Sequence, residues 1–117
     1  MNAEVSRRAD ALIEEILKTE EYAGYAESRE SALADPVSAS MLSEYRRLRS
    51  ELQTAALAGV SPDDENVKRF GELSMALQFN DQTAEFLKRE LVYQTLISEV
   101  MKKLSKITDI DAEILEI

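Results

Sequence analysis

Acidic side chains stand next to each other at three points of the chain, and these pairs are the first candidates for metal binding or acid–base chemistry. The pairs are Glu14-Glu15, Glu20-Glu21 and Asp63-Asp64. Neighbours on a helix point roughly 100° apart, so such a pair does not form a pocket. The chain contains no histidine and no cysteine, which removes the commonest metal ligand and the thiolates of zinc and iron–sulfur sites. We therefore interpret the pairs as solvated faces or helix starts, and we expect no metal and no cofactor.

Serine hydroxyls recur at Ser38, Ser40, Ser43 and Ser50, and they are the candidate nucleophiles. A serine needs a base beside it to attack a substrate, and the sequence offers no histidine for that role. A Ser–Lys pair would serve instead, but no pattern points to one. The three glycines are isolated, so no loop is built to cradle a phosphate. The sequence predicts a protein that is not an enzyme.

Arginines gather at positions 46, 47 and 49, where they form the notable basic cluster of the chain. One interpretation is a surface face in which Arg46, Arg47 and Arg49 pair with Glu44 and Glu51. The other is a small electropositive patch that meets an acidic partner or RNA, since the planar guanidinium makes paired hydrogen bonds. Both interpretations stay open.

The aromatic side chains are four tyrosines and three phenylalanines, and we expect most of them in the core. Phe79 and Phe86 flank a break in the helical pattern at Asn80-Asp81, where one of the two can stay exposed and anchor an interface. The candidate partner-binding residues are therefore Arg46, Arg47, Arg49, Phe79 and Phe86.

The charge balance restricts the classes of partner. The chain of 117 residues carries 14 basic and 23 acidic side chains, a net charge of −9. Such a charge opposes DNA binding, makes RNA an unfavoured partner, and opposes attraction to an anionic membrane. Residues 1–10 lack the apolar run of a signal peptide, and no apolar stretch approaches ~18 residues. We expect a cytoplasmic protein.

Residues that favour helices dominate the composition, and the chain holds only three glycines and two prolines. Apolar residues recur at intervals of three and four from Val5 to Leu17, which indicates an amphipathic helix. Thr19 can cap a following helix, so we expect a bend or break there, with the helical pattern continuing to about Leu33.

Three further start signals divide the rest of the chain. Asp35-Pro36 predicts a helix to about Ala58, followed by Gly59 in a left-handed conformation. Ser61-Pro62 predicts a helix capped by the serine, in which Gly71 marks a close helix crossing or is simply tolerated. Asn80-Asp81 precedes a helix over about 82–106. In the helix predicted to end near Ala58, apolar residues recur at alternating steps of four and three, which is the spacing of helices packed at a shallow angle. They are Met41, Tyr45, Leu48, Leu52 and Ala55.

These elements predict an all-α fold. Short connections between the helical segments favour antiparallel neighbours. We expect an antiparallel bundle of four main helical segments, the first bent or broken near Thr19, in a single domain over residues 1–117.

The order of these features resembles the YlbF/YmcA family of small helical bacterial regulatory proteins. The resemblance is carried by six short stretches of the sequence. They are A-x-x-L-I-x-x-I-L at 9–17, E-Y-x-x-Y at 21–25, D-P at 35–36 with E-Y-R-R-L at 44–48, G-x-S-P at 59–62, L-x-x-N at 77–80 and E-F-L-K-R-E-L at 85–91.

The resemblance implies an all-helical protein that self-associates and regulates without catalysis. Founding members act together in a complex that affects competence, biofilm formation and sporulation, and that is tied to messenger RNA maturation through RNase Y. Those members bind an iron–sulfur cluster through cysteines near the C-terminus. This chain has no cysteine and carries Asp109, Asp111, Glu113 and Glu116 there instead, so cluster binding is not carried over.

We therefore expect a non-enzymatic regulatory or adaptor protein that acts through protein–protein contacts, in control of competence, biofilm formation, sporulation or mRNA processing. We expect a homo-oligomer, with a dimer as the first choice, or a hetero-complex with related helical proteins. An apolar stripe on the first or last helix would be left for the partner. The alternative is an RNA-contacting accessory protein that uses Arg46, Arg47 and Arg49. The acidic segment 108–117 either continues a helix or docks on a partner.

Overall fold

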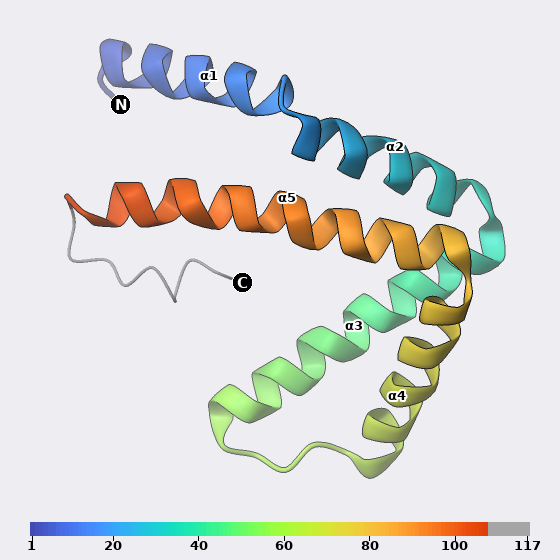
Figure 1. Ribbon diagram of the computed structural model, residues 1–117. Coiled ribbons are helices and arrows are strands. Elements are labelled where there is room, and N and C mark those ends of the chain that lie inside the picture. Colours follow the sequence, from blue (N-terminus) through green and yellow to red (C-terminus); the bar gives the residue numbers. More distant parts are fainter. Residues whose placement is uncertain (108–117) are drawn as a thin grey trace. The chain divides into compact units, whose positions relative to one another are not determined.

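The computed structural model describes residues 1–107 and places five α-helices in that range (Figure 1). They are α1 (Ala3–Leu17), α2 (Glu20–Ala34), α3 (Pro36–Ala58), α4 (Asp64–Phe79) and α5 (Asp81–Ser105). The described residues form no strand, so the all-α prediction is confirmed. None of these helices is both long and apolar enough to cross a membrane. The acidic segment 108–117 lies outside the described residues.

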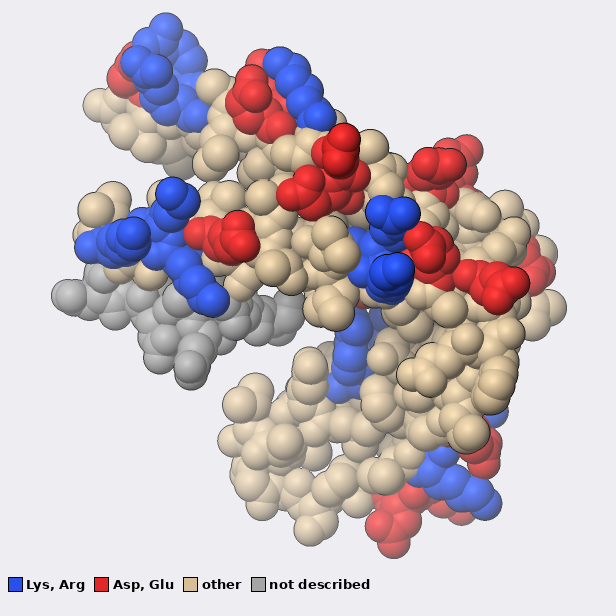
Figure 2. All heavy atoms as spheres, in the orientation of Figure 1, with Lys and Arg blue, Asp and Glu red and all other residues tan. Residues whose placement is uncertain are grey.

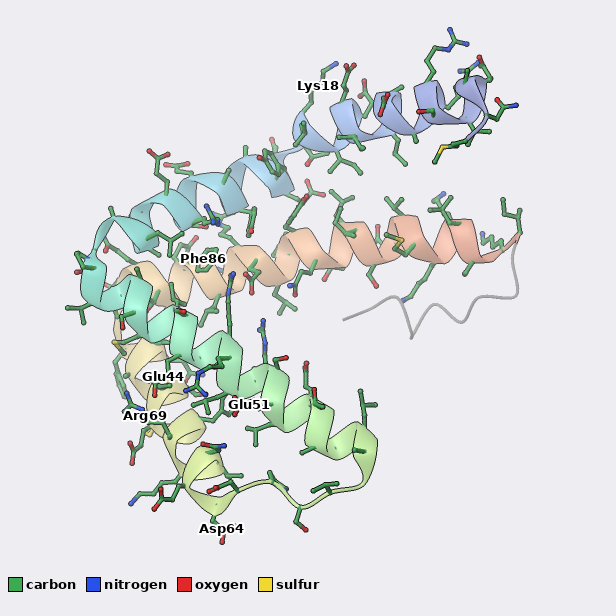
Figure 3. All side chains as sticks on the ribbon, turned by 180° about the vertical axis from the view of Figure 1, so that it is seen from behind. Lys18, Glu44, Glu51, Asp64, Arg69 and Phe86 are labelled. Atoms are coloured by element: carbon green, nitrogen blue, oxygen red, sulfur yellow. The ribbon has the colours of Figure 1, made fainter. Side chains whose placement is uncertain are left out.

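The break near Thr19 separates α1 from α2 completely. The Thr19 hydroxyl donates to the carbonyl oxygen of Ile16 at 2.7 Å, and its Oγ1 accepts from the backbone N–H of Tyr22 at 3.2 Å. One side chain thus satisfies a carbonyl at the end of α1 and an amide at the start of α2. Lys18 marks the joint in Figure 3. The chain breaks here rather than bends.

Capping side chains set the starts of α3, α4 and α5. Asp35 accepts from the N–H of Val37 at 3.2 Å, with Pro36 at the first helical position, as predicted. Asn80 accepts from the N–H groups of Gln82 and Thr83. The predicted Ser61 cap of α4 is wrong.

The cap of α4 is Asp63, whose carboxylate accepts from the N–H of Glu65 at 2.8 Å. An aspartate one position before the helix serves the first free amides directly, so the helix starts later than Ser61-Pro62 suggested. At the other end of the same connection, Gly59 has φ +69° and ends α3 in the left-handed conformation that the sequence predicted.

The described chain divides into two compact units, and each is described by itself. Unit 1 holds residues 1–27 and the segment from Lys88 onward, and unit 2 holds residues 28–87. Helices α2 and α5 each contribute to both units. The predicted antiparallel bundle and the single domain over 1–117 both stay predictions.

Unit 2 contains the apolar core. Side chains from the end of α2, from α3, from α4 and from the start of α5 are buried there. Burial of this kind is the main stabilising term for a small helical domain. The buried apolar residues are Ala32, Leu42, Leu48, Leu73, Leu77 and Phe86.

Helices α3 and α4 pack against each other within unit 2. The rings of Tyr45 and Phe70 stack with centroids 4.9 Å apart and planes 12° apart. Beside them, the guanidinium of Arg69 points at the carboxylate of Glu44 (Figure 3). Gly71 does not mark a close crossing, because a Cβ there would meet nothing within 4 Å. It is a tolerated glycine in a helix.

Unit 1 is built differently from unit 2. Its helices are α1, the first turns of α2 and the part of α5 from Lys88 onward, and α1 runs alongside α5 (Figure 1). Among its described residues no apolar side chain is buried. The apolar residues of unit 1 within the described range are therefore half-buried or exposed.

Candidate protein-interaction surface

Helix α1 presents one continuous apolar face to its surroundings. We call it the α1 apolar face, and it consists of Val5, Ala9, Leu12, Ile13, Ile16 and Leu17. Steps of four, three and one place these side chains on one side of a helix with 3.6 residues per turn. The charged residues of α1 take the other side. The sequence thus makes α1 a helix that has one side suited to burial.

The α1 apolar face stays largely open. Val5 is 57% exposed, Leu12 41%, Ile13 54% and Leu17 48%, and no residue of α1 is buried. Single exposed apolar residues are ordinary on a protein surface, but a contiguous set of this kind marks an interaction site. This face is the candidate site.

The second half of α5 adds half-buried apolar residues to the same unit. Ile97, Val100 and Met101 are partly exposed, and Leu104 is 50% exposed. Figures 1 and 3 both show α1 alongside this half of α5. Two helices side by side leave a shared surface that no third layer of unit 1 covers within the described residues, whereas helical bundles bury such surfaces against further helices.

A cluster of three tyrosines joins α2 to α5 in this unit. The ring of Tyr93 stacks on Tyr25 at 4.8 Å and meets Tyr22 edge-on at 5.6 Å. Gly24, between the two α2 tyrosines, leaves room for the side chain of Arg89. Burial of the Tyr93 hydroxyl, together with the neighbouring Tyr22 and Tyr25, raises its pKa. These ring contacts hold the start of α2 against α5. Because α1 ends just before α2 begins, they also determine where the end of α1 lies.

The predicted arginine cluster does not form one patch, because its three side chains take three directions. Arg47 pairs with Glu51 at 3.0 Å along the helix. The guanidinium of Arg49 lies 5.6 Å from the Tyr45 ring centroid, and that of Arg46 lies 5.3 Å from the Phe86 ring centroid. Two of the three guanidinium groups thus lie over aromatic rings, where cation–π attraction holds them.

The predicted partner of these arginines, Glu44, is engaged elsewhere. Both of its carboxylate oxygens accept from Arg69 on α4, at 2.8 and 3.0 Å. This hydrogen bonding to Arg69, with a smaller effect of the charges of Arg69 and Arg47, lowers the pKa of Glu44 against an opposing effect of burial. The sequence pattern along α3 could not reveal this pair, since the two residues are 25 positions apart.

The two phenylalanines beside the α4–α5 break have opposite environments. Phe86 is 1% exposed and belongs to the core of unit 2, whereas Phe79 is 82% exposed at the end of α4. The expectation that one of the two stays exposed is met by Phe79. Its large apolar ring on the surface suits an interface anchor.

A shallow pocket of about 230 Å³ opens in unit 2 between α2, α3 and the start of α5. Its polar lining comes from Arg29, Arg46 and Ser43. A guanidinium stays protonated in proteins and cannot act as a base, so this lining gives the serine no base. In residues 1–107 no three acidic side chains are grouped to hold a metal ion.

Comparison with known proteins places nearly all of the described chain in one family. Residues 5–108 match the family described as "Control of competence regulator ComK, YlbF/YmcA". A UPF0342 protein of Lactobacillus helveticus is 26% identical over 98 residues, which cover 84% of each chain. A UPF0342 protein of Halothermothrix orenii is 24% identical over 94 residues, which cover 80% of each chain.

The matched range includes every helix from α1 to α5, apart from the first two residues of α1. It also contains both the α1 apolar face and the core of unit 2. The chain belongs to the YlbF/YmcA family, which is described by its control of the competence regulator ComK.

Proposed function

We propose that this protein is a non-enzymatic regulatory or adaptor protein that acts by binding other proteins through the α1 apolar face. One observation carries the proposal: α1 is amphipathic, yet none of its residues is buried. Exposed apolar surface is unfavourable in water. A helix whose apolar face no other part of residues 1–107 buries is suited to a partner that covers it.

The family supports the regulatory part of the proposal. Its description names control of a competence regulator, and we propose competence, biofilm formation, sporulation or mRNA processing as the regulated processes, in the cytoplasm. The partners that fit the face are a second copy of this chain, giving a dimer, or a related helical protein with a matching apolar helix. Helices of either origin bury such faces by the same packing of side chains into grooves.

Light scattering at micromolar concentration tests the first partner. We expect a dimer for the unchanged protein and a monomer for Leu12→Glu, which puts a charge in the middle of the face. Leu57→Glu is the matched control, because Leu57 is 91% exposed at the end of α3 in unit 2. It should leave the dimer intact, and circular dichroism should show equal helix content for all three proteins.

The hetero-complex has its own test. Tagged protein is recovered from the cells that produce it, and a related helical protein should be recovered with the unchanged protein and with Leu57→Glu but not with Leu12→Glu. A monomer in scattering that also recovers no partner through this face would contradict the proposal.

The RNA-contacting alternative has weaker support, because Arg46, Arg47 and Arg49 point in three directions. It predicts RNA affinity that falls steeply with salt, since each phosphate contact releases counterions. Arg47→Glu with Arg49→Glu should then abolish binding. Absence of salt-dependent binding by the unchanged protein removes this alternative.

A further inference from the structure

We infer that the pocket of unit 2 binds a carboxylate that carries a short apolar group. The recognition chemistry is the same whether this carboxylate belongs to a free small acid or to an acidic side chain of a peptide. The inference goes beyond the proposed function, because the pocket uses no residue of the α1 apolar face. It follows from an apolar floor that meets two guanidinium groups.

The pocket is lined by one side of α2 and one side of α3. On α3 the lining residues follow each other at steps of three, one and three, and on α2 they are one turn apart, so each set shares one side of its helix. Phe86 at the start of α5, labelled in Figure 3, adds a third wall. The α3 residues are Ala39, Leu42, Ser43 and Arg46, and the α2 residues are Arg29 and Leu33.

Both helices place their arginine at the same end of the pocket. The connection between α2 and α3 lies at residues 34–36. Leu33 and Ala39 lie close to this connection, whereas Arg29 and Arg46 lie farther from it along their helices. The pocket therefore has an apolar end near the connection and a basic end away from it.

The floor of the pocket is apolar and buried. Leu42 is 2% exposed and Phe86 is 1% exposed. Contact with such a floor favours a ligand with an apolar group, because apolar surface gains free energy when it leaves water. The volume of about 230 Å³ lies below the usual range of sites for drug-sized ligands, so the group that enters is small.

The Phe86 ring also holds Arg46 at the pocket. The guanidinium of Arg46 lies 5.3 Å from the centroid of this ring, where cation–π attraction acts. A guanidinium meets a ring with its flat face, whereas its five N–H donors lie in its plane. Arg46 therefore has donors for a ligand carboxylate in addition to the contacts that it makes within the chain.

Arg29 differs from the arginines that pair with glutamates elsewhere in the chain. Basic and acidic side chains lie next to each other along α1 and α5 in Figure 2, and glutamates pair with Arg7, Arg8, Arg47 and Arg69. Within residues 1–107, Arg29 is exposed and takes part in no ion pair. In a chain of net charge −9, such an arginine at a pocket is suited to a carboxylate that a ligand brings.

A carboxylate fits these donors better than a phosphate does. Its two oxygens accept paired hydrogen bonds from a guanidinium, and the Ser43 hydroxyl in the lining can donate another. Phosphate oxygens point in all directions, and the apolar floor offers no donor to those that face it. The described residues that line the pocket include no acidic side chain, so the lining itself does not compete with the ligand.

Titration of the full chain with isocaproate, followed by nuclear magnetic resonance of the backbone amides, tests the inference. We expect saturable shifts at Arg29, Ser43 and Arg46, with a dissociation constant on the order of 1 mM for a ligand this small. Isocaproamide keeps the apolar group without the charge, and inorganic phosphate keeps a charge without the apolar group, so neither should bind. Equal binding of isocaproamide or of phosphate would overturn the inference.

Substitutions in the full chain locate the binding. Arg29→Gln should weaken isocaproate binding roughly tenfold, because it removes a charged donor. Arg47→Gln is the matched control: it removes the same charge, but Arg47 pairs with Glu51 at 3.0 Å and does not line the pocket. Ser43→Leu fills the pocket from an exposed position and should abolish binding. Equal weakening by Arg29→Gln and Arg47→Gln, or unchanged binding by Ser43→Leu, would contradict a site in this pocket.

A capped peptide with one glutamate between two leucines distinguishes the two sources of the carboxylate. Tighter binding of isocaproate assigns the pocket to a free small acid, and tighter binding of the peptide assigns it to an acidic side chain of a protein. Either result supports the carboxylate site, provided that Arg29→Gln weakens it. Failure of both probes to bind the unchanged protein overturns the inference and leaves the proposed function standing, because that function depends on the α1 apolar face.

Discussion

The guanidinium of Arg69 on α4 donates two hydrogen bonds to the carboxylate of Glu44 on α3, from Nε to Oε1 at 2.8 Å and from Nη2 to Oε2 at 3.0 Å. Paired bonds of this kind are the strong form of the Arg–carboxylate contact. They join two helices that also stack Tyr45 on Phe70. The pair therefore fixes the register of α3 against α4.

The Glu44–Arg69 pair makes stability depend on pH. The folded pKa of Glu44 lies below its ordinary value of 4.5, so its stabilising effect is complete above that pH and is lost as the pH falls through the lowered value. Glu44→Gln should lower the melting temperature near neutral pH, and the difference from the unchanged protein should shrink as the pH falls below 4.5 and the Glu44 carboxylate takes up a proton. Glu30→Gln, on the exposed side of α2, is the control. A difference that grows in acid would contradict this account.

The two phenylalanines at the α4–α5 break should respond oppositely to truncation. Phe86→Ala empties a buried site in unit 2 and should cost about 3–5 kcal/mol of unfolding free energy. Phe79→Ala removes a ring that is 82% exposed, so it should change stability by less than about 0.5 kcal/mol. Urea unfolding measures both. Equal losses for the two variants would show that Phe79 is covered in solution.

Two glycines give a second matched pair. Gly59 has φ +69° at the end of α3, where a side chain is strained, so Gly59→Ala should destabilise by about 1 kcal/mol. Gly71 lies inside α4 with open space at its Cβ position, so Gly71→Ala should stabilise by about 0.5–1 kcal/mol because alanine favours the helix. We expect thermal unfolding to show a lower melting temperature for Gly59→Ala and a higher one for Gly71→Ala than for the unchanged protein. Destabilisation by Gly71→Ala would mean that another surface approaches α4 there.

The buried hydroxyl of Thr83 ties the start of α5 to the end of α4. It donates to the carbonyl oxygen of Leu77 at 2.6 Å, and the residue is 1% exposed. Thr83→Val keeps the shape but leaves a buried carbonyl without this donor, which should cost about 2 kcal/mol. Thr95→Val is the control, since the Thr95 hydroxyl bonds to the carbonyl oxygen of Leu91 at an exposed site. Denaturant unfolding that finds the two variants equally stable would disprove the role of the buried bond.

Local chemistry made most of the helices predictable. Asp35-Pro36, Gly59, Asn80 and the apolar spacing each act through neighbours a few residues away, so sequence alone locates these starts and ends. The Ser61 prediction failed because Asp63 competes for the same free amides from a closer position. When two suitable capping residues lie close together, only the conformation of the backbone decides which of them caps the helix.

The candidate site, too, is partly predictable from the sequence and partly decided by the fold. The spacing of apolar residues predicts the α1 apolar face, but sequence cannot say whether such a face is covered. Arg46, Arg47 and Arg49 are close in sequence, yet rings and carboxylates on other turns and other helices decide where each side chain lies.

The sequence by itself determined the helical class, most helix boundaries, the place of a bend or break near Thr19 and the family to which the chain belongs. Each of these depends on capping, on backbone preference or on spacing within one helix. Only the tertiary structure decided that Phe86 is buried while Phe79 is exposed, that Glu44 binds Arg69, and that α1 buries none of its residues. Burial and pairing depend on which distant segments pack together, and that is a property of the folded chain as a whole.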